Sequence, residues 1–124
     1  MILVADDDPL VQHTCKHCLE AAGYEVALAD SGAEAVRAVA DGDVSVVLLD
    51  VFMPEMDGLE TLLSLKKKSP STSVVVMTGG GARGRMDFLD VAKKFGADDV
   101  IRKPFTAECL ISTIKPFSKS VWRL

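Results

Sequence analysis

Five polar residues lie at or just after the ends of apolar runs of the sequence: Asp6, Asp7, Asp50, Thr78 and Lys103. A carboxylate at the end of an apolar run is costly unless a cation or a hydrogen-bond donor meets it. Carboxylates packed together all stay ionised only when a cation neutralises them. Because this set offers oxygen ligands and no His or Cys, it suits a hard ion such as Mg²⁺, which often needs a substrate phosphate to complete its shell.

The same residues could carry out phosphoryl transfer if the fold brings them together. Asp50 can act as the nucleophile and become an aspartyl-phosphate. Mg²⁺ and Lys103 would stabilise charge on the moving phosphoryl group, and the Thr78 hydroxyl would donate to one of its oxygens. Each residue also has an ordinary interpretation, because aspartates such as Asp8 cap helices and lysines are common on surfaces. Their joint placement after strands favours the chemistry.

Apolar runs alternate with helical patterns along the chain. Buried strands are predicted at 2–5, 25–29, 44–50, 73–78 and 99–102. Helices are predicted at 9–22, 31–42, 57–70, 85–96 and 106–117. Pro9 opens the first helix and Gly23 ends it. Ser31 and Glu34 have the spacing of a capping box, and Gly96 ends the fourth helix.

Strands that are apolar on both faces and separated by helices indicate a parallel sheet covered on both sides. Right-handed crossovers make this a doubly wound α/β fold, (βα)5, in a single domain. In such a fold ligands bind outside the carboxyl ends of the strands, where the strand order reverses. We therefore expect the five polar residues at that edge. Asp30, which follows the second strand, shows no evident chemistry.

Length and composition are those of an ordinary globular domain. The chain has 124 residues, of which 48% are hydrophobic and 26% are charged. Its net charge of −4 argues against direct nucleic-acid binding, which favours a basic face. No apolar run approaches the ~20 residues that span a bilayer, and Met1 is followed by "ILVADDDP" rather than by a secretory signal. We therefore expect a cytoplasmic protein without a membrane segment.

The sequence "CKHC" at 15–18 leaves two interpretations open. Cys15, Cys18 and two nearby histidines could bind zinc or act in redox chemistry. Alternatively, both cysteines lie on the apolar stripe of the first helix, together with positions 11, 14, 19 and 22. The stripe is favoured, because no second cysteine pair is present to complete a zinc site.

Four segments, in order and at normal spacing, resemble the motifs of the receiver domain of bacterial two-component response regulators. "ILVADDDP" resembles the acidic segment, "LLDVFMPEMDG" the phosphoacceptor segment, "VVVMTGG" the Ser/Thr segment and "VIRKPF" the Lys-Pro segment. The resemblance extends over residues 1–117 and leaves 118–124 as a tail or the start of a linker. It implies a flavodoxin-like fold, as in chemotaxis regulators, with strand order 2-1-3-4-5.

The resemblance also implies a role for each site residue. Asp50 would accept the phosphoryl group. The residues implied to hold Mg²⁺ are Asp6, Asp7, Asp50 and the backbone carbonyl of Phe52, with Asp6 acting largely through water. Those implied to bind the phosphoryl group and to switch are Thr78, Gly79 and Lys103. The peptide bond before Pro104 is implied to be cis.

The implied partners are a phosphoryl donor and an output protein. The donor would be a sensor histidine kinase, a histidine phosphotransfer protein or a small molecule such as acetyl phosphate. The output protein, or a second copy in a phosphorylation-dependent dimer, would bind the face of helix four, strand five and helix five. That face includes Phe88, Lys93, Lys94, Val100, Arg102 and Ile111. Such a domain slowly loses its own phosphoryl group and is not a turnover enzyme.

Two departures from the family pattern bear on the switch. Many receivers have a Tyr or Phe three residues before the lysine, where this chain has Val100, so a rotating aromatic is not expected. The segment "GGGARGR" at 79–85 is rich in glycine, so we predict a flexible loop that orders on phosphorylation. Phe52, two residues after the acceptor, is predicted to shield the acyl phosphate from water.

Other functions stay open as alternatives. A nucleotide-binding loop needs G-x-x-x-x-G-K-[ST], which does not occur at 79–85. A hydrolase acting through an aspartyl-phosphate usually has an aspartate two residues after the nucleophile, where this chain has Phe52. A phosphorylation-independent receiver-like binding module would be expected to lack one of the acidic residues. The chain could be a stand-alone receiver or a fragment of a larger regulator or hybrid kinase, and Trp122 in its tail could contact the domain or a partner.

Overall fold

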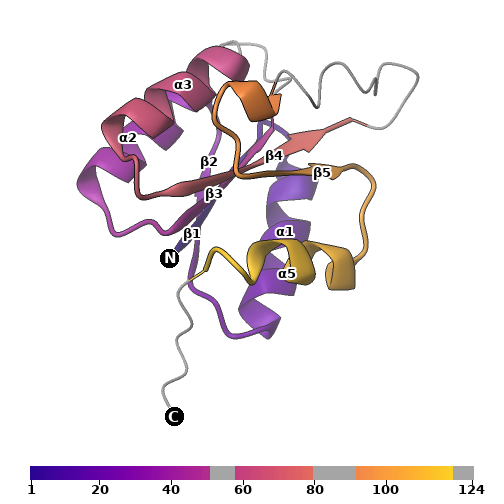
Figure 1. The fold of residues 1–124 in the computed structure, drawn as a ribbon. Coiled ribbons are helices and arrows are strands. Elements are labelled where there is room, and N and C mark those ends of the chain that lie inside the picture. The colour runs from indigo at the N-terminus through magenta and orange to yellow at the C-terminus, as the bar shows by residue number, and fades with distance from the viewer. Residues whose placement is uncertain (51–57, 80–91, 119–124) are drawn as a thin grey trace.

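The computed structural model describes residues 1–50, 58–79 and 92–118. Its centre is one sheet of five parallel strands in the order β2-β1-β3-β4-β5 (Figure 1). The strands are β1 (Ile2–Ala5), β2 (Val26–Ala29), β3 (Val46–Asp50), β4 (Ser73–Thr78) and β5 (Asp99–Arg102). The predicted fold class and strand order are confirmed, and the strand bounds differ from those predicted by two residues at most.

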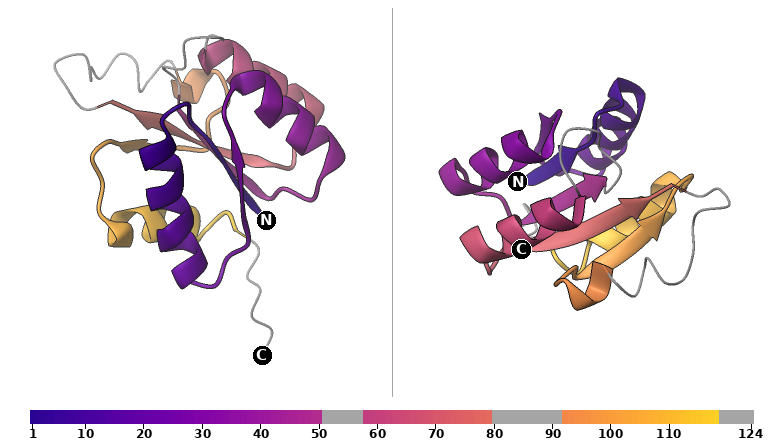
Figure 2. Two further views of the ribbon diagram at one scale, coloured as in Figure 1. Left: turned by 180° about the vertical axis from the view of Figure 1, so that it is seen from behind. Right: turned by 90° about the horizontal axis from the view of Figure 1, so that it is seen from above.

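Helices cover both faces of the sheet. The described helices are α1 (Pro9–Ala21), α2 (Gly32–Asp41), α3 (Gly58–Lys68) and α5 (Ala107–Ile114). Figures 1 and 2 show α2 and α3 together on one face, and α1 and α5 together on the other. Of the helix predicted at 85–96, residues 92–96 lie in the described part: 92–94 are helical and 95–96 form a turn. Within the described ranges no helix is long and apolar enough to cross a membrane.

Each central strand contributes alternate residues to two hydrophobic cores. Leu49 of β3 packs in the core under α2 and α3, whereas Leu48 packs in the core under α1 and α5. The same alternation holds for Leu3 and Val4 of β1. Because both faces of these strands are buried, their sequences are apolar throughout rather than alternating.

The register of the strands brings their carboxyl ends to one edge of the sheet. Ala5, the last residue of β1, pairs with Ala29 and with Leu49, so Asp6 and Asp50 follow at the same level. Asp50 in turn pairs with Met77 of β4. The polar residues after β1, β3, β4 and β5 therefore converge, as the doubly wound fold predicts.

Side chains and glycines fix the helix ends much as predicted. The Asp8 carboxylate accepts from the backbone N–H of Leu10 at 2.9 Å, and the Ser31 hydroxyl accepts from the backbone N–H of Glu34 at 3.2 Å. The predicted capping box forms only in part, because the Glu34 carboxylate accepts from the backbone N–H of Asp30 rather than from that of Ser31. Gly23 has a φ of 98°, a conformation that favours glycine at a helix end.

The apolar stripe of α1 is confirmed in part. Cys15 and Leu19 are fully buried, but Thr14 is exposed and Gln12 is buried in its place. Gln12 can be buried because its amide donates hydrogen bonds to the Asp6 carbonyl and to Asp30 Oδ1 at the edge of the sheet. Periodicity alone does not report such acceptors.

Candidate functional site

Three carboxylates meet at the carboxyl edge of the sheet. One oxygen from each of Asp6, Asp7 and Asp50 lies within 4.8 Å of the others. Asp6 follows β1 and is 0% exposed, while Asp50 ends β3 and is 6% exposed. Asp7 is exposed, which leaves one side of the cluster open to solvent. The predicted convergence of these residues is what the fold produces.

Asp6 is held at several atoms. Its Oδ1 accepts from the backbone N–H of Asp8 at 2.9 Å, and its Oδ2 accepts from Lys103 Nζ at 2.8 Å. Its own backbone N–H donates to the carbonyl oxygen of Ala29 at 3.1 Å. A fully buried carboxylate tolerates ionisation only with such donors around it.

Lys103 supplies the cation among the described residues at this edge. Its ammonium lies 2.8 Å from Asp6 Oδ2 and 3.4 Å from Asp50 Oδ2. Burial lowers the pKa of Lys103, but the hydrogen bond to Asp6 and the charges of Asp50 and Asp6 raise it more, so the net shift is upward. The side chain is therefore charged at neutral pH. Its backbone N–H donates to the carbonyl oxygen of Thr78, and the bond to Pro104 is cis.

Thr78 ends β4 with its side chain turned into the protein. It is 2% exposed, and its Oγ1 has no hydrogen-bond partner among the described residues. A buried hydroxyl without a partner is uncommon and calls for an explanation. An oxygen of an incoming anion could accept from it. At Gly79, a Cβ would meet no described atom within 4 Å.

The donors at this edge fit a hard divalent cation. All three acidic side chains offer oxygen, and one of them is open to solvent, which leaves room for the waters that Mg²⁺ retains. One ammonium beside three carboxylates leaves an excess of negative charge. The backbone carbonyl of Phe52 lies outside the described residues, as does the predicted shielding by its ring.

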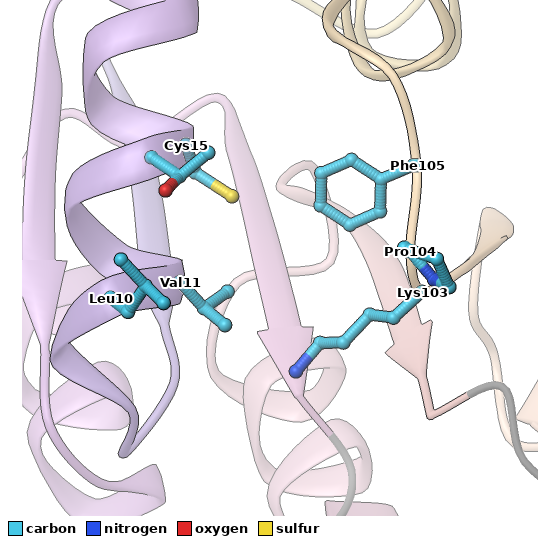
Figure 3. A pocket seen from close by; sticks show the side chains of 7 residues that line it. Leu10, Val11, Cys15, Lys103, Pro104 and Phe105 are labelled. Carbon is cyan, nitrogen blue, oxygen red and sulfur yellow. The ribbon is translucent and has the colours of Figure 1, made fainter.

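An apolar pocket adjoins the site between α1 and the β5–α5 connection. It has a volume of about 430 Å³ and is lined by Leu10, Val11, Thr14, Cys15, Lys103, Pro104 and Phe105. Figure 3 shows Cys15 of α1 facing Phe105 across the pocket. Burial, followed by the charges of Asp6 and Cys18, raises the pKa of Cys15 to about 11. Its thiol is therefore protonated at neutral pH, which favours the packing interpretation over a metal or redox role.

Sequence reasoning missed Gln12 and Asp30. The Gln12 amide donates to Asp30 Oδ1 at 2.7 Å and to the carbonyl oxygen of Asp6. A glutamine in the first turn of a helix looks like an ordinary surface residue, and an aspartate after a strand looks like a turn residue. The only sequence signal was indirect: both residues lie near the predicted edge of the sheet.

Comparisons with known proteins agree on one family. The sequence matches the response regulator receiver domain over residues 2–115. It is 35% identical over 119 residues to chemotaxis protein CheY of Listeria monocytogenes, covering 95% of this chain and 98% of that protein. It is 36% identical over 114 residues to response regulator MprA of a Mycobacterium species, covering 92% of this chain but only 48% of MprA.

Solved structures show the same likeness. A CheY-like receiver domain protein from Methanospirillum hungatei superposes with a TM-score of 0.85 at 30% identity, covering 93% of this chain and 90% of that one. A response regulator from Burkholderia pseudomallei, solved with a phosphorylated aspartic acid and a calcium ion, gives a TM-score of 0.81 at 25% identity. That match covers 90% of this chain and 64% of the other.

Proposed function

The chain belongs to the response regulator receiver domain family, and on that premise we propose that Asp50 accepts a phosphoryl group in a Mg²⁺-dependent reaction. One observation carries the proposal. The Lys103 ammonium lies 2.8 Å from Asp6 and 3.4 Å from Asp50, with the Asp7 carboxylate beside them. Catalysis of phosphoryl transfer is mostly positioning and charge stabilisation, and this arrangement supplies both.

Asp6, Asp7, Asp50 and the Phe52 carbonyl would hold the Mg²⁺. When bound, the ion supplies positive charge that offsets the carboxylates and the phosphoryl oxygens. In the transfer, an Asp50 oxygen forms a bond to phosphorus. The bond from phosphorus to the donor's nitrogen or oxygen breaks, and its electron pair stays with the donor. Lys103 favours the ionised, nucleophilic form of Asp50 and neutralises charge on the transferred group.

Thr78, Gly79 and Lys103 would bind the phosphoryl group once it is in place. The unpartnered Thr78 hydroxyl supports this role, because a phosphoryl oxygen would satisfy it. Movement of Thr78 toward Asp50 would shift the end of β4 and the segment after it. Val100 packs partly buried against the core under α2 and α3, so the signal would pass through that segment rather than through a rotating aromatic. Of the 79–85 segment, only Gly79 lies within the described residues.

The phosphoryl donor would be a histidine kinase, a histidine phosphotransfer protein or acetyl phosphate, in the cytoplasm. The output protein, or a second copy of the chain, would bind the face formed by residues near 93–94, β5 and α5. Lys93, Lys94 and Arg102 are exposed there, while Phe88 lies outside the described residues. The domain would lose its phosphoryl group slowly and would not act as a turnover enzyme.

A receiver domain of residues 1–117, followed by a tail or linker, fits the packing at the carboxyl end. Phe117 packs against the core under α1 and α5, and Ser118 donates to the Tyr24 hydroxyl at 3.1 Å. The chain spans almost all of the Listeria chemotaxis protein but about half of MprA. Both a stand-alone receiver and a part of a longer regulator are therefore represented among its relatives.

Intact mass spectrometry after incubation with acetyl phosphate and Mg²⁺ tests the proposal. We expect one phosphoryl adduct that requires Mg²⁺ and is absent from Asp50→Asn, which keeps the size of the side chain. Asp41→Asn is the matched control, because it removes an exposed carboxylate at the end of α2, outside the cluster. No adduct, together with no binding of beryllofluoride, would contradict the proposal and favour a phosphorylation-independent binding module.

A further inference from the structure

Gln12 is a buried polar residue beside the site that phosphoryl transfer does not use directly. It lies in the first turn of α1 and is 6% exposed. Its Nε2 is 2.5 Å from the carbonyl oxygen of Asp6, 2.7 Å from Asp30 Oδ1 and 3.3 Å from the carbonyl oxygen of Ala29. All three neighbours are acceptors, so the donor end of the amide must face them.

These bonds make Gln12 a clamp between three segments. The backbone N–H of Gln12 donates to the carbonyl of Asp8, which closes the first turn of α1. Its side chain reaches back to the Asp6 carbonyl at the end of β1 and across to Asp30 after β2. The Asp6 carboxylate is already held by Asp8 and Lys103. Gln12 therefore fixes the remaining backbone acceptor of the residue on which the acidic cluster depends.

We propose that Gln12 is a positioning residue for the cation site, acting through the Asp6 backbone, and that the Asp30 carboxylate holds its amide in place. This inference rests on the proposed Mg²⁺ binding by Asp6, Asp7 and Asp50. A hydrogen bond to a charged acceptor is stronger than a neutral one, so Asp30 is a suitable anchor for the amide. Partners that orient metal ligands typically change metal affinity by roughly 10- to 100-fold when they are removed.

The competing explanation is purely structural: Gln12 ties the ends of β1 and β2 together and affects only stability. The two explanations differ in what they predict for the folded protein. A structural tie lowers the midpoint of thermal unfolding and leaves the Mg²⁺ affinity of the folded state unchanged. A positioning residue also weakens that affinity, because the carboxylates no longer share one arrangement.

The test is a Mg²⁺ titration of the whole chain followed by backbone-amide NMR shifts. Gln12→Met keeps the length of the side chain and removes both N–H donors, and we expect its dissociation constant to rise roughly tenfold. Leu19→Ala is the matched control, because Leu19 is a buried residue of the same helix in the core under α1 and α5. It should lower the unfolding midpoint and leave Mg²⁺ affinity within a factor of about two.

Two variants of Asp30 distinguish a positioning role of this residue from a simple effect of its charge on Mg²⁺ binding. Asp30→Asn keeps an oxygen that can accept from Gln12, whereas Asp30→Ala does not. If Asp30 acts through Gln12, Asp30→Ala should weaken Mg²⁺ binding more than Asp30→Asn. It should then add little further loss in a chain that already carries Gln12→Met. Equal effects of Asp30→Asn and Asp30→Ala would show that only charge matters and would remove Asp30 from the proposal.

The outcomes also separate this inference from the proposed function. Wild-type binding of Mg²⁺ with an unchanged constant in Gln12→Met would overturn the positioning role and leave the phosphoacceptor proposal intact. An equal loss in Leu19→Ala would also overturn it, since destabilisation alone would then explain the effect. A wild-type chain that binds no Mg²⁺ would overturn both proposals.

Discussion

Lys103 contacts two of the three carboxylates at the site. One ammonium does not offset three negative charges, so the carboxylates repel one another when no other cation is present. Like charges held this close raise the free energy of the folded state. Asp6 is fully buried and bonded to Lys103, and Asp50 contacts the same ammonium. Asp7, which is exposed, is the member whose charge can be removed with least disturbance to the packing.

Asp7→Asn should therefore stabilise the protein without Mg²⁺ and abolish its response to the ion. Relief of repulsion should raise the unfolding midpoint by roughly 2–4 °C in a metal-free buffer. Added Mg²⁺ should raise the midpoint of the wild type by mass action but not that of the variant. Calorimetric scans with EDTA and with Mg²⁺ measure both effects. A lower midpoint for Asp7→Asn in EDTA would mean that repulsion in the cluster is not significant.

Lys103 should stabilise the fold at neutral pH and lose that effect only in strong alkali. Its pKa is raised in the folded protein, so its contribution is fully present below the ordinary value of 10.5 and is lost as pH rises through the folded pKa. Lys103→Met leaves the buried Asp6 carboxylate without its cation, which should cost about 3 kcal/mol at neutral pH.

Urea unfolding of the wild type and Lys103→Met at several pH values checks this dependence. The difference in unfolding free energy should be constant between about pH 7 and 9 and should shrink above about pH 10.5. A difference that already disappears by about pH 9 would mean that the carboxylates do not hold the lysine in its charged form.

Residue types and order were enough to predict the set Asp6, Asp7, Asp50, Thr78 and Lys103, because each lies at or just after the end of a recognisable strand. Gln12 and Asp30 could not be predicted in the same way. Their bond joins the first turn of α1 to the end of β2, and neither residue type is distinctive at its position. Pairings of this kind depend on the relative placement of elements, which periodicity does not contain.

At the scale of elements, helix ends were predictable because each depends on a few adjacent residues. The bonds at Asp8 and Ser31 are local, and so is the positive φ of Gly23. The detail that failed was the partner of the Glu34 carboxylate, which takes the N–H of Asp30. In a capping box that carboxylate reaches the N–H of the cap residue itself, which here would be Ser31.

Gly96 is a helix end at which a substitution should be costly. Its φ is 105°, and an added Cβ would lie 3.3 Å from Lys66 Cγ. Lys66 cannot easily move, because its ammonium bonds the Thr72 carbonyl and Asp98 Oδ2, each at 3.0 Å. Gly96→Ala should lower the unfolding free energy by about 1–2 kcal/mol, measured in urea.

Gly79→Ala is the matched control for Gly96→Ala. Gly79 has no positive φ, and its Cβ would meet no described atom within 4 Å, so we expect a change within about 0.5 kcal/mol. Equal costs for the two variants would show that backbone strain and the Lys66 contact do not determine the effect.

At the scale of the whole molecule, one sheet separates two cores and carries the site at its edge. The core under α2 and α3 and the core under α1 and α5 share the backbone of the strands but not their side chains. Alternate strand residues enter opposite cores, so the apolar runs of the sequence predicted both layers at once. The relative placement of α1 and β2, on which the Gln12 bonds depend, was beyond that prediction.

Substitutions in the two cores should therefore have additive effects on the free energy of unfolding, while the two cores still unfold together. Leu62 of α3 and Ile114 of α5 are both fully buried, on opposite sides of the sheet. Leu62→Ala should cost about 2–5 kcal/mol and Ile114→Val about 0.5–1.5 kcal/mol. Since the side chains share no partner, the unfolding free energy of the double variant should fall by the sum of the two single losses, within about 0.5 kcal/mol.

All three variants should still unfold in one transition, because neither core can persist without the sheet. Urea unfolding followed by circular dichroism and by NMR checks both points, and two separate transitions would show that the layers are independent units.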